Sequence, residues 1–98
     1  MVAQMFSLGY ILATPDLIKA LYAVDPKQMP ESVVLELARR HMAGDWGDVD
    51  EMSREANELA LELELRLVSR YTTDKGVSLS IATEWDRSLT IASLTEAE

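Results

Sequence analysis

Hydrophobic positions in residues 58–69, ELALELELRLVS, follow two periods at once. The alternating leucines are typical of a half-buried strand, whereas the Glu, Leu, Ala and Arg composition is typical of a helix. The preceding residues favour a helix, because their apolar side chains follow the i, i+4, i+7, i+11 spacing of a buried stripe. We therefore predict a helix to about residue 62, a tight turn near 63–64, and a strand within LRLVSRYTT (65–73). The stripe that we expect to be buried consists of Met52, Ala56, Leu59 and Leu63.

Two earlier helices are predicted from their end signals. Thr14 can cap the first, Pro15 suits its first turn, and Pro26 ends it. The second begins near Pro30, and Gly44 after it is a natural left-handed cap. Its inner side is expected to carry Val33, Val34, Leu37, Ala38 and His41.

The third helix is expected to be capped by Asp48, with Glu51 three residues later as in a capping box. SLGYILA (7–13) predicts a short strand, and the alternating residues of VSLSIATE (77–84) and LTIASL (89–94) predict two more. The expected fold class is α+β: two to three N-terminal helices packed on a three- to four-stranded antiparallel meander.

Composition narrows the class of protein. The 98 residues, 48% of them apolar, suit a single domain over 1–98 with one core. The chain contains no cysteine, and we expect neither a signal peptide nor a membrane span, which favours the cytoplasm. A net charge of −8 argues against direct nucleic-acid binding, because phosphates attract Lys and Arg. Residues 45–64 hold eight acids and one base, which is nearly the whole excess.

Three stretches of the chain carry a family resemblance: LGYILATPDLIKAL (8–21), RRHMAGDWGDVDEMSREANELAL (39–61), and RLVSRY to ATEWDRSLTIASL (66–94). The chain resembles a family of short, uncharacterised bacterial proteins carried on plasmids and prophages. Members of that family run from L-G-x-x-x-A-T-P through R-H-x-x-G-D-W-G to I-T-E-A-D-R-S. This chain departs from them at Ala82 and Trp85, and it has Glu64 where members tend to have a glycine. The resemblance implies a mobile-element setting and no particular activity.

His41 with Asp45, Asp48 and Asp50 offers side chains suited to a divalent metal or to acid–base chemistry. The spacing fits no calcium loop, and one histidine makes a poor transition-metal site. We therefore favour structural roles for these residues and expect no metal, no cofactor and no catalytic residue. The chain also lacks a G-x-S-x-G elbow and a glycine loop for phosphate, which disfavours an ordinary enzyme.

The two tryptophans are expected to differ in exposure. Trp46, between two acids and two glycines, should anchor a helix junction in the core, with an exposed recognition role as the alternative. Trp85 lies in a predicted turn and is the better candidate for an interface anchor. Asp86 and Arg87 beside it either join that interface or pair with each other across the turn.

The third helix also carries an acidic stripe, about 100° round the helix from the apolar one. Such stripes are usually solvated faces. However, like charges at i, i+4 repel each other, and their axial spacing of about 4.5–6 Å is within a factor of two of the spacing of phosphates along a nucleic acid. An acidic helix of this kind can occupy the basic nucleic-acid groove of another protein. The stripe consists of Glu51, Glu55, Glu58 and Glu62.

Two classes of function follow from these patterns. The first is a small acidic inhibitor from a phage or mobile element, of anti-CRISPR or anti-restriction type, that binds a basic surface of a host defence complex. Its expected contacts are Asp48, Glu51, Glu55, Glu58, Glu62, Trp85 and Arg87. The alternative is a small enzyme or toxin-like factor that uses His41, Asp45 and Arg87. A structural or regulatory accessory protein, dimeric through its sheet edge, stays open as well.

Overall fold

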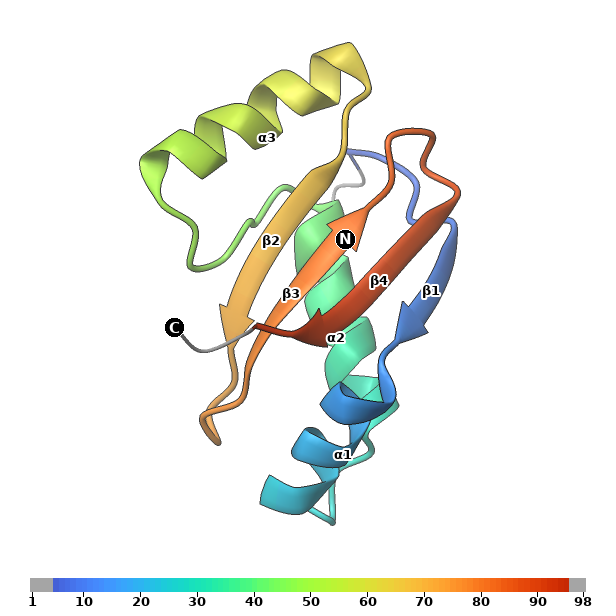
Figure 1. Ribbon diagram of the computed structural model, residues 1–98, viewed down its shortest axis with the longest axis vertical. Helices are drawn as coiled ribbons and strands as arrows, with labels where there is room; N and C mark the ends of the chain where they lie inside the picture. The colour runs from blue at the N-terminus through green and yellow to red at the C-terminus, as the bar shows by residue number, and fades with distance from the viewer. Residues whose placement is uncertain (1–4, 96–98) are drawn as a thin grey trace.

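The computed structural model describes residues 5–95 and consists of a four-stranded sheet with helices packed against it (Figure 1). Strands β2, β3 and β4 form an antiparallel meander, and β1 pairs in parallel with β4 in the order β1-β4-β3-β2. The fold is therefore α+β as predicted, but the sheet is mixed and not wholly antiparallel. The elements are β1 (Tyr10–Ala13), α1 (Pro15–Val24), α2 (Pro30–Met42), α3 (Glu51–Leu63), β2 (Leu67–Thr72), β3 (Ser78–Thr83) and β4 (Leu89–Leu94).

Helices α1 and α2 begin where their sequence signals predict. The backbone N–H of Leu17 donates to the hydroxyl of Thr14 at 3.4 Å, and proline occupies the first turn of both helices. Helix α1 ends at Val24, just before Asp25 and Pro26. The predicted inner side of α2 is confirmed, with Val33 partly buried and the other four residues fully buried.

The main core lies between α1, α2 and one face of the sheet, and α2 passes behind the strands in Figure 1. Alternate residues of β2, β3 and β4 point to these helices, as the two-residue period of a strand requires. A second cluster lies beneath α3 and joins it to the start of β2. The first cluster consists of Leu17, Leu21, Val34, Leu37, Ala38, Tyr71, Val77, Leu79, Ile81 and Ala92, and the second of Phe6, Trp46, Ala60 and Leu67.

Helix α3 differs from its prediction in two ways. It lies beside strand β2 at the edge of the sheet, not over its face (Figure 1). Its cap is Asp50, whose carboxylate accepts from the N–H of Ser53 at 2.7 Å, so the capping box at Asp48 was wrong. The reason is that the N–H of Asp48 is used elsewhere: it donates to the carbonyl of Arg70 on β2, which holds Asp48 ahead of the helix.

The apolar stripe predicted to be buried in α3 is exposed instead. The side chains that α3 buries are Asn57 and Ala60, roughly 130° and 70° round the helix from the centre of the stripe. This rotation is set by hydrogen bonds from Asn57 to the backbone of β2, which hydrophobic spacing does not reveal. The exposed residues are Met52, Ala56, Leu59 and Leu63.

The change from helix to strand in ELALELELRLVS falls where predicted. Helix α3 ends at Leu63, Glu64 takes a left-handed conformation with φ 56° and ψ 54°, and β2 begins at Leu67. A left-handed residue ends a helix most readily when it is glycine. A glycine at this position would therefore have a structural explanation.

Replacing Glu64 with glycine should raise the free energy of unfolding by about 1 kcal/mol, because glycine adopts positive φ without the steric penalty of a side chain. Chemical denaturation would measure the change. Glu62→Gly is the matched control, since the same substitution inside α3 should destabilise by about 1 kcal/mol. Equal effects at the two positions would contradict the assignment of strain to Glu64.

Candidate partner-binding surface

Asn57 fixes α3 to the outer edge of β2. Its side-chain amide donates to the carbonyl of Val68 at 2.7 Å, and its amide oxygen accepts from the N–H of Val68 at 3.1 Å. The side chain thus takes the place of a neighbouring strand. Sequence reasoning missed Asn57, although a signal was present, because asparagine is a poor residue for the middle of a helix.

Arg87 fixes the other end of α3. Its guanidinium donates to the carbonyls of Ala60 at 3.2 Å and Leu65 at 2.6 Å, and to those of Glu84 and Trp85 within its own turn. The Ala60 carbonyl also accepts from the N–H groups of Glu64 and Leu65, so the arginine adds a further donor at the C-terminal end of the helix. The β3–β4 turn is thereby held against the C-terminal end of α3.

The outward half of α3 carries two stripes side by side. Met52, Leu59 and Leu63 are 79%, 52% and 58% exposed. The acidic stripe lies next to them, about 100° round the helix, and all four of its glutamates are exposed. Among residues 5–95 the ion pairs are Arg40–Asp45 and Arg66–Glu84, so none of these glutamates has a cationic partner in that part of the chain.

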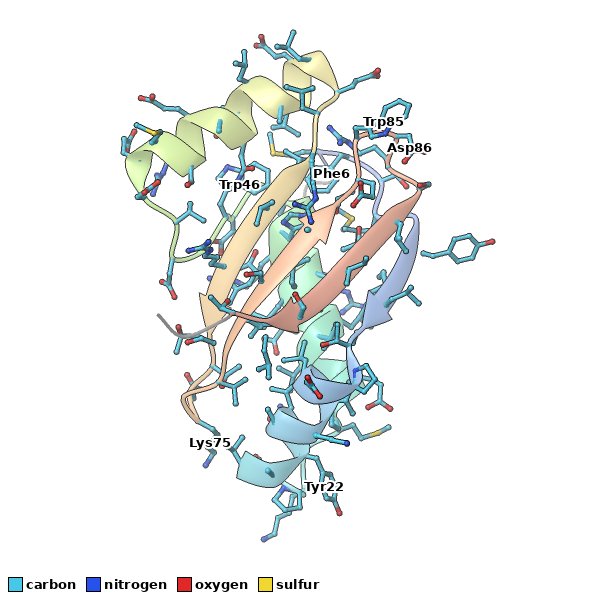
Figure 2. The ribbon with its side chains drawn as sticks, viewed as in Figure 1. Phe6, Tyr22, Trp46, Lys75, Trp85 and Asp86 are labelled. Carbon is cyan, nitrogen blue, oxygen red and sulfur yellow. The ribbon has the colours of Figure 1, made fainter. Side chains whose placement is uncertain are left out.

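Trp85 extends this surface at the C-terminal end of α3. It is 62% exposed on the β3–β4 turn (Figure 2). Asp86 does not pair with Arg87; its carboxylate accepts from the N–H and the hydroxyl of Ser88 at 3.1 and 2.6 Å. These hydrogen bonds lower the pKa of Asp86. The turn therefore has a defined shape, with its tryptophan facing the solvent.

Side chains of the R-H-x-x-G-D-W-G segment make contacts within the fold. Arg40 pairs with Asp45 at 2.8 Å and lies over the ring of Tyr71, and this arginine lowers the pKa of the Asp45 carboxyl. Trp46 is buried against Phe6, as predicted for a core anchor (Figure 2). Its indole N–H is buried and bonds to no group among residues 5–95, at a cost of roughly 1–3 kcal/mol.

His41 is fully buried in the last turn of α2 and belongs to a chain of hydroxyl groups. Its Nδ1 lies 2.5 Å from the Ser69 hydroxyl, and its Nε2 lies 3.0 Å from that of Thr83. Thr83 reaches Thr90 at 2.7 Å, and Thr90 donates to the carbonyl of Leu8 at 2.6 Å. Since Thr90 uses its proton on a carbonyl, Thr83 donates to Thr90 and His41 carries its proton on Nε2.

The alternative catalytic set is not joined by contacts. Burial, with a smaller effect from the charge of Arg87, lowers the pKa of His41 to about 4, so the imidazole is neutral at pH 7 and both of its nitrogens are occupied. Asp45 pairs with Arg40, and Arg87 donates to backbone carbonyls. Among the described residues, no hydrogen bond or ion pair connects His41, Asp45 and Arg87.

Residues 5–95 contain no group of three His, Asp or Glu side chains arranged to hold a metal ion. Nor do they include a helix of the length and apolar character that a bilayer crossing requires. Comparison with protein-family models, curated proteins and solved structures found no match for the chain.

Proposed function

We propose that the protein is a small acidic inhibitor from a phage or other mobile element that binds a host nucleic-acid-processing defence complex, of anti-CRISPR or anti-restriction type. The observation that carries the proposal is the outward half of α3. Unpaired carboxylates run beside exposed apolar side chains on a helix whose inner side is fixed by Asn57 and Arg87. A surface of this kind is ready to bind without reorganising.

The two stripes suit two parts of one partner surface. Carboxylates spaced about 4.5–6 Å apart along the helix complement the cations that line a nucleic-acid groove. The apolar stripe next to them, with Trp85 at its end, supplies the contact area that an amphipathic helix buries in a groove. The partner is therefore a protein with a basic groove and an apolar wall.

Other parts of the proposal rest on the sequence. The family resemblance supports a mobile-element origin, and the absence of cysteine supports action in the cytoplasm. Asp48 is exposed in the loop before α3 and adds one more acid to the surface. The guanidinium of Arg87 is occupied within the fold, so its direct contact with a partner stays a prediction.

Neutralising the acidic stripe should slow association with the target at least tenfold at low salt and flatten its salt dependence, because electrostatic steering is lost. The variant replaces all four glutamates with glutamine, which keeps helix propensity nearly unchanged. Stopped-flow or surface-based kinetics against purified CRISPR effector and restriction complexes would measure the rate. The substituted residues are Glu51, Glu55, Glu58 and Glu62.

A matched control removes the same charge from elsewhere on the surface. It converts four exposed acids outside α3 to their amides and should retain most of the association rate, since steering depends on where the charge lies. Absence of binding to every complex, with no loss of interference in cells, would overturn the proposal, as would equal rates for both variants. The control residues are Asp16, Glu31, Glu36 and Asp74.

A further inference from the structure

The two edges of the sheet are treated differently by the chain. At the β2 edge, the side chain of Asn57 bonds to the backbone N–H and carbonyl of Val68. The N–H of Arg70 donates to the carbonyl of Trp46, and its carbonyl accepts from the N–H of Asp48. These contacts occupy groups that would otherwise accept another strand. A covered edge is a common protection against pairing with a second chain.

The β1 edge has no such cover among the described residues. The N–H groups of Tyr10 and Thr14 donate to Ser88 and Ala92 on the β4 side. Because backbone groups alternate along a strand, those of Ile11 and Ala13 point outward, away from β4. Strand β1 therefore presents two N–H groups and two carbonyls to an incoming strand.

The side chains at this edge are apolar and exposed. Tyr10, Ile11 and Leu12 are 81%, 37% and 55% exposed. A groove of about 290 Å³ lies beside the strand on the helix side, and among the described residues that line it Glu31 is the only charged one. The other residues lining the groove are Ile11, Leu12, Ala13, Ile18, Val34 and Leu35.

The opposite face of the sheet has an apolar row that ends at the same edge. The pairing register places Val68 beside Ala82, Ala82 beside Ile91, and Ile91 beside Leu12. One apolar side chain per strand thus crosses the whole sheet on the face without α1 and α2. The row ends at Leu12, whose side chain is exposed to solvent, and a further strand paired with β1 would extend it.

We propose that a second copy of this chain occupies the β1 edge, by antiparallel pairing of β1 with β1 about a two-fold axis at Leu12. This register sets Ile11 of each copy opposite Ala13 of the other, so all the outward backbone groups of both residues are paired. Registers centred on Ile11 or Ala13 pair fewer groups, because they bring in Gly9, before the strand, or Pro15, which has no N–H.

The proposed dimer joins the apolar rows of the two copies through Leu12. Pairing covers the exposed parts of Tyr10, Ile11, Leu12 and Leu35, roughly 500 Å² per copy, which is close to the lower limit for a specific interface. We therefore expect a weak, concentration-dependent dimer. Each copy carries a charge of −8 and brings Glu31 to the interface, so salt should strengthen the dimer by screening repulsion.

Sedimentation equilibrium of the full chain, from about 1 to 500 µM, tests the proposal. The apparent mass should rise from 10.9 kDa toward twice that value, and more steeply in salt. Leu12→Lys should abolish the rise, because two like charges then meet at the axis. Leu59→Lys is the matched control: it adds the same charge at a similarly exposed leucine on α3, and the mass should still rise.

A monomer at every concentration would overturn the proposal, and so would a dimer that Leu59→Lys disrupts and Leu12→Lys does not. Far-UV circular dichroism of both variants establishes that they are folded. Hydrogen exchange of the wild-type protein gives an independent measurement: the Ile11 and Ala13 amides should become at least tenfold more protected at high concentration. Unchanged exchange at those two amides would place any dimer elsewhere.

Discussion

Replacing Gly47 with alanine will destabilise the protein by about 3–5 kcal/mol or prevent it from folding. Gly47 has φ +74°, and an added Cβ would lie 2.0 Å from the carbonyl oxygen of Arg70 and 2.6 Å from the ring of Tyr71. The carbonyl is held in place because it accepts the N–H of Asp48. Relief of the clash would separate the 46–48 segment from β2. The hydrogen bonds of Trp46 and Asp48 to Arg70, which help to cover this edge, would then be lost.

Gly76→Ala is the matched control for this prediction. Gly76 also has positive φ, +89°, but nothing lies within 4 Å of its added Cβ. The substitution should then lower the free energy of unfolding by only about 1–2 kcal/mol, because the left-handed backbone conformation is its sole cost. Urea unfolding of the two variants would separate steric contact from backbone preference, and equal losses would show that the approach of Gly47 to Arg70 is not critical.

Stability should fall by about 3 kcal/mol as the pH drops from 6.5 to 4, owing to His41. The folded protein holds the pKa of His41 near 4, below its ordinary value of 6.5, so the unfolded chain binds a proton in this range and the folded chain does not. Above pH 6.5 His41 is mostly neutral in both the folded and the unfolded chain, so this loss of stability is largely absent there. Protonation would also oblige Nδ1 to donate, and the hydroxyl of Ser69 would have to reverse.

His41→Gln identifies the source of this pH dependence. The variant should be less stable at pH 7, but its stability should change much less between pH 6.5 and 4. Asp45 has a lowered pKa because of Arg40, and its contribution is lost below its ordinary value of 3.8, outside this range. Urea midpoints across pH would give both slopes, and a wild-type slope retained in the variant would assign the effect to other groups.

Local signals in the sequence predicted most of the secondary structure. Thr14 and Pro15 begin α1, Pro30 begins α2, and the helix-to-strand change falls at Leu63 and Glu64, because each depends on residues close in the chain. The direction of β1 was not predictable in this way. Alternating apolar residues show that a strand exists, but they do not show which strand it pairs with or in which direction.

The candidate surface was predicted in part. The glutamates of α3 and Trp85 are exposed as expected, but the apolar stripe of α3 was assigned to the core. Hydrophobic spacing gives the relative angle between two stripes and not the direction in which either points. That direction is set by Asn57, whose partner Val68 is known only once the sheet is formed.

The parallel pairing of β1 with β4 also has a consequence for how the protein is made. Tyr10 is paired with Leu89, so β1 can enter the sheet only after β4, about 80 residues later in the chain, has been synthesised. Helices α1 and α2 likewise emerge from the ribosome before the strands they cover. Such distant contacts slow folding, because the entropy cost of closing a long loop comes before the favourable energy of the contacts that the closed loop makes. The four-stranded sheet is therefore expected to be completed only after β4 has been synthesised.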